Sequence, residues 1–375
     1  MAEAFIVGAV RTPVGRRNGG LAGVHPVDLA AHVLTEIVAR TGADPGAVDD
    51  VIMGCVSQIG PQSIDIARNA WLSAGLPENV PGVTIDRQCG SSQQAVLSGT
   101  QDLVVAAGVE SMSMVPMGST VTLPLASGMP PPFGQGWKDR YGDQEISQFR
   151  GAQLVCEKWG IKRLQLEEYS LESHRRAIRA IDEGRFAREI TPVGGVTTDE
   201  GPRRDTSLEK MAALAPLREG WEITAATASQ ISDGAAALMI ASQDAVERHG
   251  LTPRARIHAL TVIGSDPVFM LTGPIPATEQ ALARGGLGIE DIDVFEVNEA
   301  FAPVLIAWSA DTGASLKKTN PNGGAIALGH PLGATGAITM TKLLHELELT
   351  GGRYGLQTMC EGGGQANATI IERLA

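Results

Sequence analysis

The chain has 375 residues, of which 43% are hydrophobic and 19% are charged, and its formal net charge is −12. This length predicts two or three globular units, and the acidic balance argues against a protein that binds nucleic acid. No run approaches eighteen apolar residues, so we expect no membrane segment. The four cysteines form no C-x-x-C pair, so we expect no zinc ribbon. No basic leader precedes the first apolar run, and we expect a cytoplasmic location.

The first third of the chain alternates short apolar runs with helical patterns. Strands are expected at 4–10, 51–56, 83–86 and 103–108, and helices at 27–40 and 64–74. Strands separated by helices indicate βαβ units and a mostly parallel sheet.

The middle of the chain, 116–227, has a different character. Pro116, Pro124 and the prolines at 130–132 interrupt regular structure, whereas 166–181 has the pattern of a charged amphipathic helix. An ordinary linker would not be this long, so we interpret the region as an inserted loop or lid domain.

The alternation returns after residue 228, with strands expected at 235–240, 293–297, 355–359 and 368–371. Segment 46–58 is similar to 288–302, and the surroundings of Cys89 are similar to those of His330. The sequence therefore predicts a duplication, with an N-terminal half at 1–115, the insertion at 116–227 and a C-terminal half at 228–375.

Three segments have residues suited to chemistry. Cys89 follows a predicted strand and precedes a helix, where a helix N-terminus would favour the thiolate, although a small buried cysteine is the alternative. His330 lies between a glycine and a proline, which favours a fixed turn that presents the ring, although a lone histidine is often structural. Cys360 precedes three glycines, whose N–H groups could stabilise an oxyanion or only form a tight turn between strands.

Taken together, these segments resemble the thiolase family, the acetyl-CoA C-acyltransferases. The segments 228–237, 273–277 and 298–302 also match marks of that family, and the resemblance extends from Arg11 to the C-terminus. It implies an α/β fold of two similar halves, layered α-β-α-β-α, with an inserted loop domain.

The resemblance also implies residue roles. Cys89 would be the nucleophile that carries the acyl group as a thioester, His330 its base and Cys360 a second acid/base. Asn298 would hold a water in one oxyanion hole, and the backbone N–H groups of Cys89 and Gly362 would form the other. Ser229 would contact the pantetheine of CoA, and Arg203 and Arg204 are candidates for its phosphates.

The implied reaction is acyl transfer between a 3-oxoacyl-CoA and CoA, with CoA as a substrate and with no metal or other cofactor. A degradative enzyme of fatty-acid or steroid catabolism is favoured over a biosynthetic acetyl-CoA acetyltransferase. A decarboxylating condensing enzyme would have a second histidine in place of Cys360 or Asn298, and a non-catalytic acyl-CoA or lipid carrier would not need the three reactive side chains. The implied partners are CoA thioesters and further copies of the chain, as a homodimer or homotetramer, with no nucleic acid and no membrane.

The sequence departs from the family pattern in two places. The helix after Cys89 is short, because only 93–97 precedes Ser98 and Gly99, and about two turns are missing. Glu361 replaces a small apolar residue, and Ala366 replaces a glycine. Both substitutions lie near the expected acyl path, which suggests a degradative enzyme for unusual acyl groups.

Overall fold

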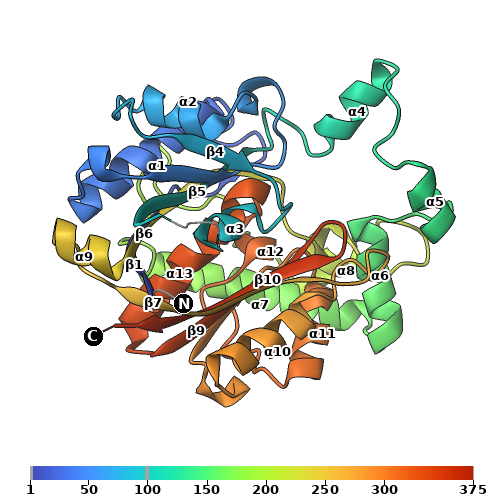
Figure 1. Ribbon diagram of the computed structural model, residues 1–375. Coiled ribbons are helices and arrows are strands. Elements are labelled where there is room, and N and C mark those ends of the chain that lie inside the picture. Colours follow the sequence, from blue (N-terminus) through green and yellow to red (C-terminus); the bar gives the residue numbers. More distant parts are fainter. Residues whose placement is uncertain (1–2, 98–100, 375) are drawn as a thin grey trace.

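A central mixed sheet organises the computed structural model, which describes residues 3–97 and 101–374 (Figure 1). Within these residues the strands are β1 (Ala4–Arg11), β2 (Gly15–Arg16), β3 (Asp50–Gly54), β4 (Gly82–Ile85), β5 (Leu103–Ser111), β6 (Ser232–Ser242), β7 (Ala255–Gly264), β8 (Val294–Val297), β9 (Tyr354–Glu361) and β10 (Gln365–Arg373). Their order is β4-β3-β5-β6-β1-β7-β10-β9-β8, and β2 pairs with β6.

The two ends of this sheet repeat one pairing pattern. In the first half β3 is parallel to β5, while β5 with β6 and β6 with β1 are antiparallel. In the second half β8 is parallel to β9, while β9 with β10 and β10 with β7 are antiparallel. The halves meet where β1 pairs with β7 through Phe5 and Ile6. The predicted α/β fold with duplicated halves is confirmed.

The expectation of a mostly parallel sheet is wrong. Only β3–β4, β3–β5 and β8–β9 are parallel among the described strand pairs. Parallel neighbours need a crossover connection, but β9 and β10 are joined by a turn of three glycines and therefore run antiparallel.

The helices form three layers around the two half-sheets. They are α1 (Pro26–Thr41), α2 (Ile66–Ser73), α3 (Ser91–Leu97), α4 (Ser119–Ala126), α5 (Gln135–Tyr141), α6 (Gln148–Trp159), α7 (Arg163–Asp182), α8 (Leu208–Ala212), α9 (Gln243–His249), α10 (Pro274–Gly285), α11 (Ala302–Thr312), α12 (Ala325–Leu328) and α13 (Thr335–Thr350). One core packs α1 and α2 on the first half-sheet, a second packs α10 and α11 on the other, and a third surrounds α3 and α13 between them.

The central layer brings together the helices that follow Cys89 and His330. A Cβ placed on Gly336, in α13, would lie 2.2 Å from the backbone nitrogen of Gln93, in α3, so the two helix backbones are in direct contact. These helices are counterparts in the duplication, but α3 has seven residues and α13 has sixteen. The expected shortening at Ser98 and Gly99 lies outside the described residues.

The insertion contains α4 to α8. Its long helix α7 packs on α12 through a small apolar core, whereas α4 and α5 project from the body of the molecule (Figure 1). The division at 116–227 stays a prediction, and β6, placed after the insertion in that division, pairs with β5 and β1. None of the helices in the described part of the chain is long and apolar enough to cross a membrane.

Candidate active site

Cys89 lies in a tight turn between β4 and α3, which we call the Cys89 turn (residues 87–91). The N–H of Gly90 donates to the carbonyl of Arg87 at 3.1 Å, and the N–H of Ser91 donates to that of Gln88 at 3.1 Å. Gln88 has a φ of 49°, in the left-handed region, so this backbone is sharply bent. The turn presents the sulfur to an apolar cluster with Met112, Leu332 and Met359.

The Cys89 thiol is neutral in this environment. Burial, and to a lesser extent the carboxyl of Glu361, raise its pKa to about 12, while the N–H of Cys89 itself opposes the shift. The expected lowering by the helix N-terminus is therefore wrong, because desolvation outweighs the few N–H dipoles of a short helix. The thiol needs a base to become a nucleophile.

His330 is held as a neutral imidazole. Its backbone N–H donates to the carbonyl of Gln230 at 3.1 Å, and its Nδ1 lies 2.7 Å from the hydroxyl of Thr335. That hydroxyl donates to the carbonyl of Pro331 at 2.8 Å, so it accepts from Nδ1–H, and Nε2 has a lone pair that accepts from Nδ2 of Asn298 at 3.3 Å. Burial lowers the pKa of His330 to about 4, which leaves Nε2 able to accept a proton.

Cys360 and Cys89 line the same cavity of about 340 Å³, although they come from opposite halves of the chain. Gly362 and Gly363, in the turn between β9 and β10, line it as well. Burial raises the pKa of Cys360 well above its usual value, and the nearby Cys89 adds to that shift. His330 is not among the lining residues, but Leu332, two residues later, is.

Asn298 joins His330 to the end of β8. Its Nδ2 lies 3.3 Å from Nε2 of His330, and its Oδ1 is buried without a hydrogen-bond partner among the described residues. The side chain of Asn320 clamps the residue before Asn298, because its Oδ1 accepts from the N–H of Val297 at 2.9 Å and its Nδ2 donates to the carbonyl of Val297 at 2.8 Å. The position of Asn298 is thus fixed by backbone contacts.

Glu299 fastens this loop to the insertion, and sequence reasoning missed it. One carboxylate oxygen accepts from the hydroxyl of Tyr169 at 2.8 Å and from Asn320 Nδ2 at 3.0 Å. The other accepts from the hydroxyl of Ser173 at 2.7 Å and from the N–H of Ile326 at 3.1 Å. An acidic residue between Asn298 and an apolar helix start is the signal that could have marked it.

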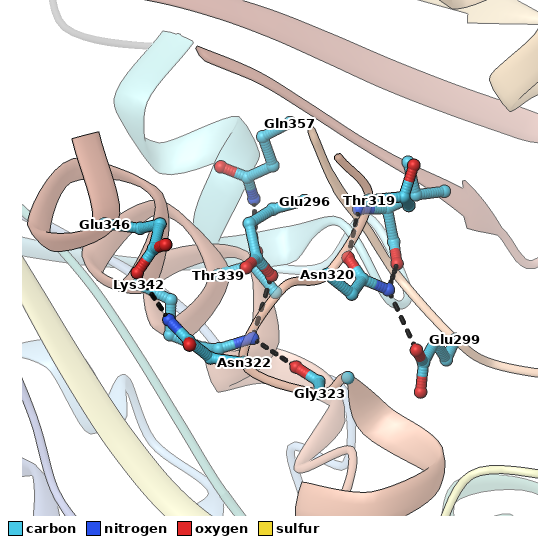
Figure 2. A network of polar contacts seen from close by, with 12 residues as sticks. Glu296, Glu299, Thr319, Asn320, Asn322, Gly323, Thr339, Lys342, Glu346 and Gln357 are labelled. Carbon is cyan, nitrogen blue, oxygen red and sulfur yellow. Dashed lines mark hydrogen bonds and ion pairs between the residues drawn. The ribbon is translucent and has the colours of Figure 1, made fainter. Parts of the chain in front are cut away.

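A buried ion pair supports the same loop (Figure 2). Lys342, on α13, donates to Glu296 at 2.9 Å and to the carbonyl of Gly323 at 2.7 Å, and both charged side chains are almost fully buried. Asn322 donates to Glu346 at 2.7 Å. Helix α13 therefore holds the segment that leads to His330.

Glu110, at the end of β5, connects the two halves around the cavity. Its carboxylate accepts from the N–H groups of Val56 at 2.9 Å, Ser57 at 3.1 Å and Gly333 at 2.9 Å. These bonds stabilise the charged form, whereas burial raises its pKa. The partners are far apart in sequence, so no local pattern predicted this role.

A second cavity, of about 260 Å³, lies beside the segment that contains Ser229. The neighbours of Ser229 in sequence line it, together with Arg203 and Lys210. Ser229 itself is half-buried and donates its N–H to the carbonyl of Ala300, a residue that lines the first cavity. Arg204 instead forms an exposed ion pair with Asp182 at 2.6 Å.

Comparison with known proteins identifies the chain. A model of the thiolase N-terminal domain matches residues 4–244, and a model of the thiolase C-terminal domain matches residues 251–373. The chain belongs to the thiolase family. It is therefore an acyltransferase, and the resemblance inferred from its motifs is confirmed.

Its relatives are similar over nearly their whole lengths. A steroid 3-ketoacyl-CoA thiolase of Mycobacterium tuberculosis is 59% identical over 387 positions, which cover 100% of this chain and 95% of the relative. A beta-ketoadipyl-CoA thiolase of Pseudomonas aeruginosa is 44% identical over 99% of both chains. The human mitochondrial 3-ketoacyl-CoA thiolase in complex with CoA has a TM-score of 0.89 and 37% identity, with 100% of this chain and 98% of the other covered. The first alignment is longer than the 375 residues here, so this thiolase lacks residues that its relative has.

Proposed function

We propose that this thiolase cleaves 3-oxoacyl-CoA substrates with a bulky apolar acyl group, using CoA and a thioester on Cys89. The observation that carries the proposal is that Cys89 and Cys360 line one cavity. Part of the lining of this cavity is apolar and comes from the insertion, through Met117, Val121 and Phe133. The family and the name of the steroid thiolase relative agree with a degradative reaction.

In the proposed first half-reaction, Nε2 of His330 takes the proton of the Cys89 thiol and the sulfur attacks C3 of the substrate. The bond between C2 and C3 breaks, the acyl group stays on Cys89, and Cys360 protonates C2 of the departing acetyl-CoA enolate. In the second half-reaction, Cys360 takes the proton of incoming CoA, whose sulfur attacks the thioester and releases the Cys89 thiolate, which takes its proton back from His330.

Each half-reaction develops an oxyanion that needs donors. We assign the enolate oxyanion to His330 and to a water bound by Asn298, a role that the unpartnered buried Oδ1 of Asn298 supports. We assign the tetrahedral oxyanion to the N–H groups of Cys89 and Gly362, two residues that line the same cavity as Cys360.

We infer that CoA enters from the second cavity. The sequence neighbours of Ser229 line the second cavity and its N–H binds Ala300, which lines the first; this position suits the narrow pantetheine chain, and Arg203 suits the phosphates. Lys210 and Arg204 are weaker candidates because Asp205 and Asp182 already neutralise them.

The experiment measures thiolytic cleavage of 3-oxoacyl-CoA substrates by monitoring the loss of their enolate absorbance. We expect a higher kcat/KM for steroid-derived and medium-chain substrates than for acetoacetyl-CoA, and an acyl adduct on Cys89 in the mass spectrum. Cys89→Ser should remove both turnover and adduct, whereas Cys156→Ser, at a buried thiol in the insertion, is the matched control. A preference for acetyl-CoA condensation would favour the biosynthetic enzyme, and CoA binding without turnover would favour the carrier.

We further propose a homodimer or homotetramer in the cytoplasm. Strand β4 ends the sheet order and exposes Val83 by 41%, so a second copy could pair along this edge. Four unpaired cysteines suit a reducing compartment. Light scattering after size-exclusion chromatography measures the number of copies, and a monomer at micromolar concentration would contradict the assembly.

A further inference from the structure

Glu361 is a buried acidic residue that the proposed mechanism does not use. It ends β9, directly after Cys360, and it is 0% exposed. Neither of its carboxyl oxygens has a hydrogen-bond partner among the described residues. Because an ionised carboxylate without donors is very costly to bury, this environment favours the neutral carboxylic acid.

The Cys89 turn rests on the face of the β9–β10 hairpin that carries Glu361. Glu361 pairs in register with Gln365, and Asn367 lies two residues further along β10, so the three side chains share one face. Arg87 donates to Gln365 Oε1 at 2.7 Å, and Asn367 Nδ2 donates to the carbonyl of Gly90 at 3.3 Å. Two of the three side chains thus bind the turn directly.

The third side chain, Glu361, contacts the turn at Gly90. A Cβ on Gly90 would lie 2.0 Å from Oε1 of Glu361 and 2.9 Å from Nδ2 of Asn367, so both groups lie against the Cα of Gly90. The Oδ1 of Asn367 is also buried without a partner. The carboxyl of Glu361 and the Oδ1 of Asn367 are therefore two buried acceptors on side chains that lie against the same turn, and a proton on Glu361 would bring a further donor to them.

We propose that Glu361 is a positioning residue for Cys89: as a carboxylic acid it donates to Asn367 and supports the Cys89 turn, and its ionisation sets the alkaline limit for forming the Cys89 thiolate. This inference rests on the role proposed for Cys89. It assigns a purpose to the residue that departs from the family pattern next to Cys360.

The charges around Glu361 agree with this role. Burial raises the pKa of Glu361 to about 8, while the positive charge of Arg87 and the N–H of Asn367 oppose the shift. The titratable neighbours are Cys89 and Cys360, and the carboxylate of Glu361 raises the pKa of both thiols. Asp86, which lines the same cavity, also raises the pKa of Cys89.

The sign of the pH effect follows from these facts. Below about pH 8 Glu361 is neutral and does not oppose the Cys89 thiolate. Above that pH Glu361 becomes negative, and its charge opposes ionisation of the Cys89 thiol. The thiolate fraction of Cys89 should therefore rise less than tenfold per pH unit above pH 8, although its own pKa is far higher.

The test is alkylation of Cys89 by iodoacetamide from about pH 6.5 to 9.5, with the modified peptide quantified by mass spectrometry. In the parent protein, the logarithm of the rate should rise with a slope of one up to about pH 8 and more slowly above it. The amide of Glu361→Gln can donate to Asn367 but does not ionise, so the slope for this variant should stay at one. Its rate at pH 9.5 divided by its rate at pH 7 should therefore exceed the same ratio for the parent by about tenfold. Asp86→Asn is the control, because it removes another carboxylate near Cys89 and should keep the bend of the curve.

A straight parent curve over the whole range would overturn the proposal without any variant. A bend that persists in Glu361→Gln would overturn the proposal as well. If the glutamine variant does not fold, Glu361→Ala provides the second measurement, because it also removes the carboxyl group. Alkylation reports the thiol of Cys89 whether or not the enzyme turns over, so failure here is distinguishable from failure of the proposed catalytic roles.

Discussion

Glu299→Gln tests whether the loop that carries Asn298 is held by one carboxylate. The glutamate accepts from Tyr169 and Asn320 on one oxygen and from Ser173 and Ile326 on the other. In the glutamine variant one oxygen becomes an NH₂ group, which cannot accept. A hydroxyl can rotate away from it, but the N–H of Asn320 or of Ile326 cannot.

The loss can be worked from these contacts. One hydrogen bond to a charged group contributes about 1.5–3 kcal/mol, and an unsatisfied buried N–H costs about 1–3 kcal/mol. We therefore expect the free energy of unfolding to fall by about 3 kcal/mol or more in urea titrations. Because Asn298 is the adjacent residue, kcat for thiolysis should fall by about tenfold with a smaller change in KM.

The control is Glu168→Gln, an exposed change on the same helix as Tyr169 and Ser173. It should alter stability by less than about 0.5 kcal/mol. A loss below about 1 kcal/mol in Glu299→Gln, or an unchanged kcat, would refute the view that this carboxylate organises the loop.

Three further outcomes are expected. Lys342→Met should reduce the free energy of unfolding by about 3–5 kcal/mol because it leaves Glu296 buried and unpaired. Adding Glu296→Leu should restore most of the lost stability, and equal instability of the single and double variants would contradict this explanation. His330 acts as a base only when it is neutral, and burial lowers its pKa to about 4, so kcat/KM should begin to fall only as the pH drops to about 4. A fall near pH 6.5 would show that His330 is not buried in the free enzyme. Phe133→Ala should raise KM for bulky 3-oxoacyl-CoA several-fold more than KM for acetoacetyl-CoA, and equal effects would remove Phe133 from the acyl wall.

The elements that sequence reasoning found have strong local signals. Helix α1 combines apolar residues at helical spacing with Pro26 at its start and Gly42 in the left-handed region at its end. Strand β7 was not expected, because Arg256 and His258 interrupt its apolar pattern, and Arg256 is accommodated by ion pairs with Glu372 on β10 and with Glu3. Strand direction likewise depends on partners that are distant in the chain.

The residues of the candidate site also divide into those with a local sequence signal and those that depend on distant partners. The turns of Cys89, His330 and Cys360 are marked locally by glycine and proline, so the sequence alone pointed to them. Glu110 and Glu299 were not found, because the groups that they bind lie as many as 223 and 130 residues away. Burial also reversed the expected shift of the Cys89 thiol, since no sequence pattern reports how much water a folded pocket excludes.

The backbone contact between α3 and α13 separates two tasks within the molecule. The reactive turns lie at the starts of helices that touch without intervening side chains, so there is little room for their spacing to drift as residues elsewhere change. The proposed acyl wall, by contrast, comes from Met117, Val121 and Phe133, in the part of the insertion that projects with α4 and α5 (Figure 1). New substrates can therefore be accommodated by remodelling the projection while the chemistry is inherited intact.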